Sequence, residues 1–114
     1  VYAESTGSTN QFLHIVIAIA GHEINGITKI FFNETEVPTT QDGSDSNGVA
    51  RLFPSSGNQY EGKARFKVHT GADAQVADAD LVSEISQWTT NHRLRGTAYV
   101  YARILMFILM VYQI

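Results

Sequence analysis

The sequence predicts a mainly β fold: an antiparallel sheet or a partly open barrel, with one short helix that brings it close to the α+β class. Three patterns support this. Residues 12–20 are rich in β-branched side chains, and residues 62–70 alternate apolar and basic side chains, as strands do. Leu81, Ile85 and Trp88 follow the i, i+4, i+7 spacing of one helical face.

The first part of the chain is expected to form strands. Residues 1–10 resemble a strand followed by a polar turn. Residues 12–20 are apolar on both faces, which is typical of a strand in the centre of a sheet. Asn25-Gly26 predicts a tight turn, and residues 27–33 form the next strand candidate.

The middle of the chain is expected to alternate loops and strands. Residues 38–48 are the most polar stretch and predict an exposed, mobile loop. Residues 49–53 predict a weak strand, and the turn Pro54-Ser-Ser-Gly-Asn predicts a hairpin into the strand over residues 62–70. One face of that strand is apolar, and the other is expected to be solvated. The solvated face comprises Lys63, Arg65, Lys67 and His69.

The last part is expected to hold the helix and a final strand. Asp78 or Asp80 is placed to cap a short helix that runs through Glu84. Residues 96–103 alternate side chains with the period of a strand. The core is expected between the apolar faces of residues 12–20, 27–32, 64–68 and 98–104.

Length and composition fit a single domain over residues 1–114. The net charge of −3, without a long basic stripe, argues against nucleic acid as a partner. The chain has no cysteine, which excludes disulfides and thiolate metal sites. Residues 104–111 are uniformly apolar but far shorter than the ~20 residues of a membrane helix, and neither membrane insertion nor a signal peptide is expected.

No catalytic, cofactor-binding or metal-binding residues are expected. The four histidines are scattered, without the convergent spacing that a zinc site requires. They are His14, His22, His69 and His92. Asp42, Asp45 and Asn47 fit either a weak divalent-ion site or a solvated loop, and the loop is the better interpretation. The basic residues of 62–70 fit either a phosphate-binding stripe or a solvated strand face, and the solvated face is preferred.

Aromatic and apolar residues toward the C-terminus are the candidates for a protein interface. Trp88 fits an interface anchor or, more commonly for a lone tryptophan beside a short helix, the core. The apolar strip over residues 104–111 is expected to pack in a self-contact, most simply a two-fold dimer. The candidate interface residues are Trp88, Tyr99, Tyr101, Ile104, Leu105, Phe107 and Ile108.

Several motifs in combination resemble a known family. Phe12-Leu-His leads to Ala18-Ile-Ala-Gly-His-Glu and then to Ile30-Phe-Phe-Asn-Glu. Gly71-x-x-x-Gln-x-Ala-Asp-x-x-Leu and Trp88-Thr-x-x-His-Arg-Leu-Arg-Gly-x-Ala-Tyr follow. Together they resemble the tail-tip hub proteins of long-tailed bacteriophages and prophages, the family related to the central tail-fibre protein of lambda-like phages. The similarity covers nearly the whole chain up to Arg103.

The resemblance implies a structural role without catalytic residues. Hub proteins are much longer, so an internal fragment is implied. They assemble as a ring, commonly a trimer, that closes the tail tube and connects to other tail proteins. The implied location is the virion tail, or the bacterial cytoplasm for an expressed prophage fragment. After Arg103 the chain departs from the family pattern, and a neighbouring frame of one back-translation restores it, which leads to the hypothesis of a frameshifted, truncated gene.

The alternative is a small ligand- or carbohydrate-binding β-domain without catalytic activity. Such a domain requires a concave pocket with convergent polar groups. Two or more of the four histidines within ligand distance of one point would instead favour a metal site or an enzyme.

Overall fold

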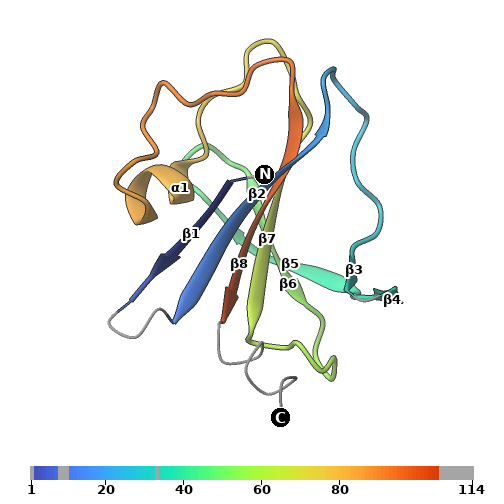
Figure 1. Ribbon diagram of the computed structural model, residues 1–114. Helices are drawn as coiled ribbons and strands as arrows, with labels where there is room; N and C mark the ends of the chain where they lie inside the picture. The colour runs from blue at the N-terminus through green and yellow to red at the C-terminus, as the bar shows by residue number, and fades with distance from the viewer. Residues whose placement is uncertain (1, 8–10, 33, 106–114) are drawn as a thin grey trace.

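The computed structural model describes residues 2–7, 11–32 and 34–105 of the chain. In this part eight strands and one helix follow one another. Their bounds are β1 (Tyr2–Thr6), β2 (Phe12–Ala20), β3 (Phe31–Phe32), β4 (Thr35–Glu36), β5 (Thr39–Ser44), β6 (Ala50–Pro54), β7 (Ala64–His69), α1 (Ala79–Glu84) and β8 (Ala98–Leu105). Strands β1, β2, β8 and β7 lie side by side (Figure 1).

Six strands form one open antiparallel sheet in the order β1-β2-β8-β7-β6-β5. Strands β1 and β5 are its two edges, so the described sheet does not close into a barrel. Strands β3 and β4 pair separately as a short hairpin. The predicted mainly β class with one short helix is therefore confirmed, in its open-sheet form.

Strand β2 lies inside the sheet, as its apolar composition predicts, because it pairs with β1 on one side and β8 on the other. The described pairing with β1 covers residues 12–16 of β2. Farther along β2, Ile17 and Ile19 are 39% and 51% exposed. The sequence predicted apolar faces here but gave no sign that this end of the strand is open to solvent.

One face of the sheet is covered by α1 and the loop that follows it. Asp78 caps the helix by accepting a hydrogen bond from the backbone N–H of Leu81 at 3.0 Å, which confirms one of the two predicted caps. Leu81, Ile85 and Trp88 are buried with Tyr101, as predicted, but only Leu81 lies in the helix: Ile85 is its C-cap, and Trp88 lies in the loop that follows. A helix of six residues depends on such packing, because isolated helices this short are unstable in water. No helix in the described ranges has the length and hydropathy needed to cross a membrane.

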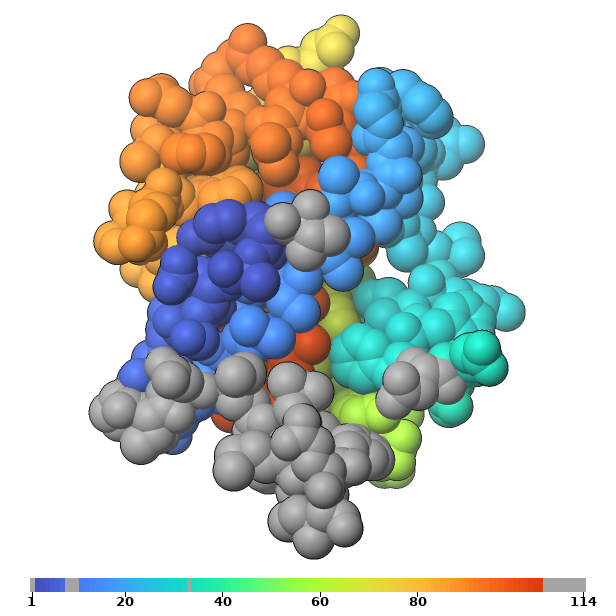
Figure 2. Space-filling model, in the orientation of Figure 1, coloured from blue at the N-terminus to red at the C-terminus, as the bar shows by residue number. Residues whose placement is uncertain are grey.

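The opposite face is covered by the segment between β2 and β5. Ile30, Phe32 and Val37 from this segment pack with Tyr60 against Phe66 of β7. The ring of Phe32 stands edge-on to those of Tyr60 and Phe66, with centroid distances of 4.9 and 5.6 Å. Figure 2 shows this segment, in light blue to teal, on one flank of the molecule and the region around and after α1, in orange, on the other (Figure 2).

The strand predicted over residues 27–33 is wrong in its extent. Only Phe31–Phe32 pairs, forming β3, while residues 27–30 are irregular and Asn33 lies outside the described residues. The segment is held by side-chain packing on the sheet and by a backbone hydrogen bond of 2.7 Å from the N–H of Val37 to the carbonyl of Ile30. Apolar content alone does not distinguish this packing from a strand ladder.

The loop predicted over residues 38–48 is wrong for residues 39–44. Thr39–Ser44 forms β5, an edge strand paired with β6, and Asp45 immediately after it is 7% exposed. Most side chains of β5 are exposed, so the strand has no apolar alternation by which to recognise it. Polar composition is common in edge strands, because it discourages pairing with other chains.

Strand β7 lies where the sequence predicted it, but the expected solvated face is wrong. Arg65, Lys67 and His69 are 5%, 0% and 6% exposed, and Lys63, just before the strand, is half-buried. The prediction assumed that alternating charge marks a face turned to water. Here that face turns toward α1, whose acidic side chains compensate the basic ones.

Two isoleucines test how far stability depends on the contact between α1 and the sheet. We expect Ile85→Ala, at a side chain that is 1% exposed, to lower the free energy of unfolding by about 2–5 kcal/mol. Ile19→Ala removes the same atoms from a 51% exposed site and should cost less than half as much. Urea denaturation followed by circular dichroism measures both. Equal losses would contradict the packing described for α1.

Candidate functional site

The buried face between β7 and α1 holds most of the charged side chains that this fold takes out of water. The basic ones alternate along β7, and the acidic ones come from α1, its cap and the turn after β5. Arg51 on β6 and Arg103, the cross-strand neighbour of Arg65 on β8, complete the set. We call it the buried charge network, and its members are Asp45, Arg51, Arg65, Lys67, His69, Asp78, Asp80, Glu84 and Arg103.

Lys67 is the centre of this network. Its side chain is 0% exposed, and its Nζ donates to carboxylates from three places in the chain. It contacts Asp45 Oδ2 directly, and it lies 3.0 Å from Asp78 Oδ1 and 3.1 Å from Asp80 Oδ2. Three carboxylates therefore use all three donors of one ammonium group, and this joins β7 to the turn after β5 and to α1.

The surroundings keep this group of side chains charged. Burial alone would lower the pKa of Lys67, but the contacts with Asp45, Asp78 and Asp80 outweigh it and raise the pKa above its ordinary value. Burial alone would also raise the pKa of Asp45. The hydrogen bonds from Lys67 and from backbone amides instead hold that pKa below its ordinary value. Removing one partner of such a buried pair strongly destabilises a protein, because the other charge is left uncompensated.

Asp45 is fixed by its own turn before it meets Lys67. Its Oδ1 accepts backbone N–H bonds from Asn47 at 2.8 Å and Val49 at 3.0 Å, which leaves Oδ2 to face the ammonium. The whole residue is 7% exposed, and its side chain alone is 0% exposed. The interpretation of Asp42, Asp45 and Asn47 as a solvated loop is therefore wrong for Asp45, because a buried lysine compensates its charge.

Asp78 links helix capping to the network. Its Oδ1 accepts from the backbone N–H of Leu81 and from Lys67, each at 3.0 Å, and its Oδ2 lies 2.6 Å from Nε2 of His69. Burial would raise the pKa of Asp78, but the hydrogen bonds from His69, Leu81 and Lys67 lower it below its ordinary value. The His69 ring stacks on Tyr99 with a centroid distance of 4.4 Å. The sequence found the cap but not its second role.

Asp80 and Glu84 lie one helical turn apart and hold the guanidinium groups. Arg51 binds Asp80 through two hydrogen bonds of 2.9 Å, and this contact holds the pKa of Asp80 well below its ordinary value of 3.8. Arg65 binds Glu84 through two bonds of 3.0 and 2.8 Å, and Arg103 adds a third at 3.2 Å. Such two-bond pairs fix geometry as well as charge.

A hydrogen-bonded chain extends the network to the edge strand β1. The hydroxyl of Tyr101 donates to Glu84 at 2.6 Å, so the Nδ1 of His14, 2.5 Å away, donates to the Tyr101 oxygen. The Nε2 of His14 then accepts from the Thr6 hydroxyl at 2.7 Å. Burial lowers the pKa of His14, which favours this neutral ring. The chain connects β1, β2, β8 and α1 in one polar path.

The acidic side chains around Lys67 also have the composition of a metal site. Ligand oxygens of Asp45, Asp78 and Asp80 lie within 4.8 Å of one another, and this group is the set of potential ligands found among the described residues. The ammonium of Lys67 contacts all three of them and compensates their charge. The arrangement is that of a cation site in which the cation is a side chain of the protein.

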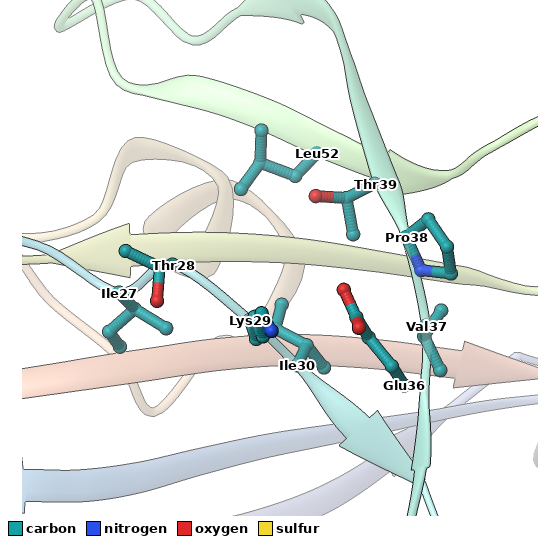
Figure 3. Close-up of a pocket in the computed structure, with 9 residues that line it drawn as sticks. All are labelled: Ile27, Thr28, Lys29, Ile30, Glu36, Val37, Pro38, Thr39 and Leu52. Atoms are coloured by element: carbon teal, nitrogen blue, oxygen red, sulfur yellow. The ribbon is translucent and has the colours of Figure 1, made fainter.

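A separate pocket of about 240 Å³ lies between residues 27–30 and the start of β5. Figure 3 shows the carboxylate of Glu36 and the hydroxyls of Thr28 and Thr39 around it (Figure 3). Glu36 is exposed, and the volume is below the ~300–1,000 Å³ of typical small-molecule sites. This pocket by itself therefore gives little support to the alternative of a ligand-binding domain. Its full lining is Ile27, Thr28, Lys29, Ile30, Glu36, Val37, Pro38, Thr39 and Leu52.

The structure places the predicted interface residues in three different situations. Trp88 is 7% exposed, and Tyr99 and Tyr101 are 0% exposed, so all three contact neighbours within the chain. Ile104 and Leu105 are half-buried at the end of β8. The remaining two, Phe107 and Ile108, lie outside the described residues. Among the residues that the structure describes, the exposed large apolar side chains are instead Ile17, Ile19, Phe31 and Val76.

The histidines are dispersed, as the sequence suggested. His14 and His69 are buried in different branches of the network, while His22 and His92 are exposed. The sequence analysis did not predict that acidic side chains pair with β7. The pattern that could have indicated it is Asp80 and Glu84 at helical i, i+4 spacing, together with a strand that presents basic side chains at every second position.

The chain matches no protein-family model, no curated protein and no solved structure. Its function must therefore be inferred from its motifs and from the geometry of its sites. The charge network is buried at its centre, and each of its basic side chains contacts an acidic one. These properties are those of a structural network that holds segments of the chain together.

Replacing the central ammonium tests this interpretation. Lys67→Met keeps an unbranched apolar stem but leaves buried carboxylates without their cation, and we expect a loss of about 3–5 kcal/mol in the free energy of unfolding at pH 7. The loss should shrink toward pH 4, because the uncompensated carboxylates then bind protons in the folded state. Lys63→Met, at a half-buried side chain just before the strand, should change little. Denaturant titrations at several pH values measure this; a loss independent of pH would contradict it.

Proposed function

We propose that the chain is a structural module of a bacteriophage or prophage tail tip, a fragment of a hub protein that acts by protein–protein assembly. The proposal starts from the resemblance carried by the sequence motifs. The main structural support is that the motif residues make contacts that stabilise the fold. This is what we expect of a structural protein.

The motif that begins at Gly71 illustrates this. Gly71 has φ +87°, and a side-chain carbon there would lie 2.8 Å from the backbone nitrogen of Ala98, so glycine is required on two grounds. Gln75 accepts from the N–H of Gly71 and donates to the carbonyls of Arg93, Leu94 and Thr97 at 2.8–3.2 Å. One amide group thus holds the loop before β8 in place.

The motif that begins at Trp88 serves the same loop. The Trp88 ring stacks on that of His92 and lies 5.4 Å from Tyr2 of the edge strand. The Nδ1 of His92 accepts from the backbone N–H of Thr89 at 3.0 Å. Leu94, with φ 52°, packs against the core. These contacts favour a structural role for the motif over a catalytic one.

Exposed apolar side chains on the surface are suited to contact with other proteins. Ile17, Ile19 and Phe31 are exposed apolar side chains, and such residues favour contact with another protein. The basic side chains of β7 are bound to carboxylates, which is consistent with protein rather than nucleic acid as the partner. The proposed partners are other tail proteins and further copies of the chain. The proposed location is the virion tail, or the bacterial cytoplasm for a prophage product.

The first test of this function examines phage particles and their genes. We expect the DNA on both sides of the coding sequence to encode tail proteins. Mass spectrometry of tails purified from the phage or induced prophage should detect peptides of this sequence or of the hub that contains it. A locus without phage genes, or tails that lack these peptides, would overturn the proposal.

Self-association is tested separately in solution. We expect light scattering of the purified chain to report an oligomer, because residues 104–111 form a long apolar strip on a small domain. A version that ends at Leu105 keeps all of β8 but loses most of the strip, and it should form smaller oligomers or none. If both versions scatter as monomers, the predicted self-contact is wrong.

A further inference from the structure

We propose that Lys67 and Asp45 form an intramolecular isopeptide bond in the folded protein. The proposal goes beyond the proposed structural function and does not depend on it. It rests on four observations: direct contact of the two groups, their exclusion from water, donors placed for an oxyanion, and a neighbouring carboxylate that can carry a proton.

Contact and burial come first. Lys67 Nζ touches Asp45 Oδ2, and the carbonyl carbon that the amine must attack lies one bond beyond that oxygen. Both side chains are 0% exposed. Tyr101, also 0% exposed, is the cross-strand neighbour of Lys67 on β8. Two reactive groups held in contact need no encounter, and a site closed to water favours condensation over hydrolysis.

The second oxygen of Asp45 sits where an oxyanion hole would hold it. Oδ1 accepts the backbone N–H groups of Asn47 and Val49 at 2.8 and 3.0 Å. Backbone donors at this distance stabilise the negative charge of a tetrahedral intermediate. The geometry therefore distinguishes the two oxygens of Asp45: Oδ1 is the one that stays, and Oδ2, facing Lys67, is the one that leaves.

Asp78 is the proton carrier. Its Oδ1 lies 3.0 Å from Lys67 Nζ, and its Oδ2 lies 2.6 Å from Nε2 of His69. Its side chain is 0% exposed. A carboxylate in this position accepts a proton from the nitrogen and returns it to the leaving oxygen.

The reaction balances as a dehydration. One ammonium proton passes to Asp45 Oδ2, and the free amine of Lys67 attacks the Asp45 carbonyl carbon, which places negative charge on Oδ1. Asp78 removes a second proton from the nitrogen and delivers it to Oδ2. The carbon–Oδ2 bond then breaks, its electron pair leaves with the oxygen, and water departs. The third hydrogen remains on the new amide nitrogen.

The network described above is the state before reaction. Its carboxylates favour the charged form of Lys67, so the neutral amine is rare and the reaction is slow. Each molecule needs to react only once, and the reverse reaction requires water that the closed site excludes. The product joins the turn after β5 covalently to β7 and locks the edge hairpin β5–β6 to the sheet. The bond removes the charges of Lys67 and Asp45 together; Asp80 keeps its two hydrogen bonds with Arg51, and Asp78 keeps its contacts with His69 and the N–H of Leu81.

Intact mass under denaturing conditions tests the proposal on the natural chain, incubated in its folded state. We expect a mass lower than that of the sequence by one water molecule. Proteolysis should then release a branched peptide that contains both Asp45 and Lys67. A natural chain that stays at its full sequence mass, while circular dichroism shows it folded, overturns the proposal.

Variants sharpen the test. Asp45→Asn should lose ammonia instead of water and arrive at the same final mass, because the product is the same amide. Asp45→Ala should keep its sequence mass, and Asp78→Asn should react at least tenfold more slowly. The matched control is Glu84→Gln. Glu84 belongs to α1, the helix that Asp78 caps, and its partners are Arg65 and Tyr101 rather than Lys67, so this variant should still lose water. Water loss that persists in Asp45→Ala, for example from a succinimide at Asp42-Gly43, or a cross-link confined to Asp45→Asn, would overturn it.

Discussion

The rest of this structure depends on one buried ammonium group. Lys67 lies at 0% exposure on a central strand, and its charge is compensated by carboxylates from the turn after β5, from the helix cap and from α1. Taking these charges out of water costs free energy, which direct contacts must offset. Each segment therefore has to sit where its carboxylate reaches Lys67, so the ion pairs select one arrangement of the chain.

The helix shows how polar and apolar contacts divide this work. Its six residues are too few to persist alone, and it buries Leu81 and Ile85 on the sheet. The same helix presents Asp80 and Glu84 to the basic side chains of β7. The apolar stripe sets how close α1 lies, and the charged groups set its rotation and register. A fold of this size has a modest core, so such direction-dependent contacts contribute a large part of its specificity.

Local patterns predicted the features that local physics controls. The β-branched run of β2, the alternation of β7, the cap at Asp78 and the stripe at Leu81 each follow from neighbours in the sequence, and each was found. The mistakes arose where burial depends on distant residues. Ile30 and Phe32 are apolar because they cover the sheet, and Thr39–Ser44 is polar because it lies at an edge. Composition indicates whether a segment is buried. In these two segments it did not indicate whether the segment forms a strand.

The sequence by itself determined the mainly β class, most strand positions, the single helix and its cap, because those depend on the periodicity of side chains along one segment. Only the tertiary structure decided that the basic face of β7 is dry. Alternating charge looks the same whether it meets water or a row of carboxylates, and the partners of Lys67 stand 11 to 22 positions away along the chain. The site exists because the fold brings Asp45, Asp78 and Asp80 to one point, and no spacing within the sequence encodes that convergence.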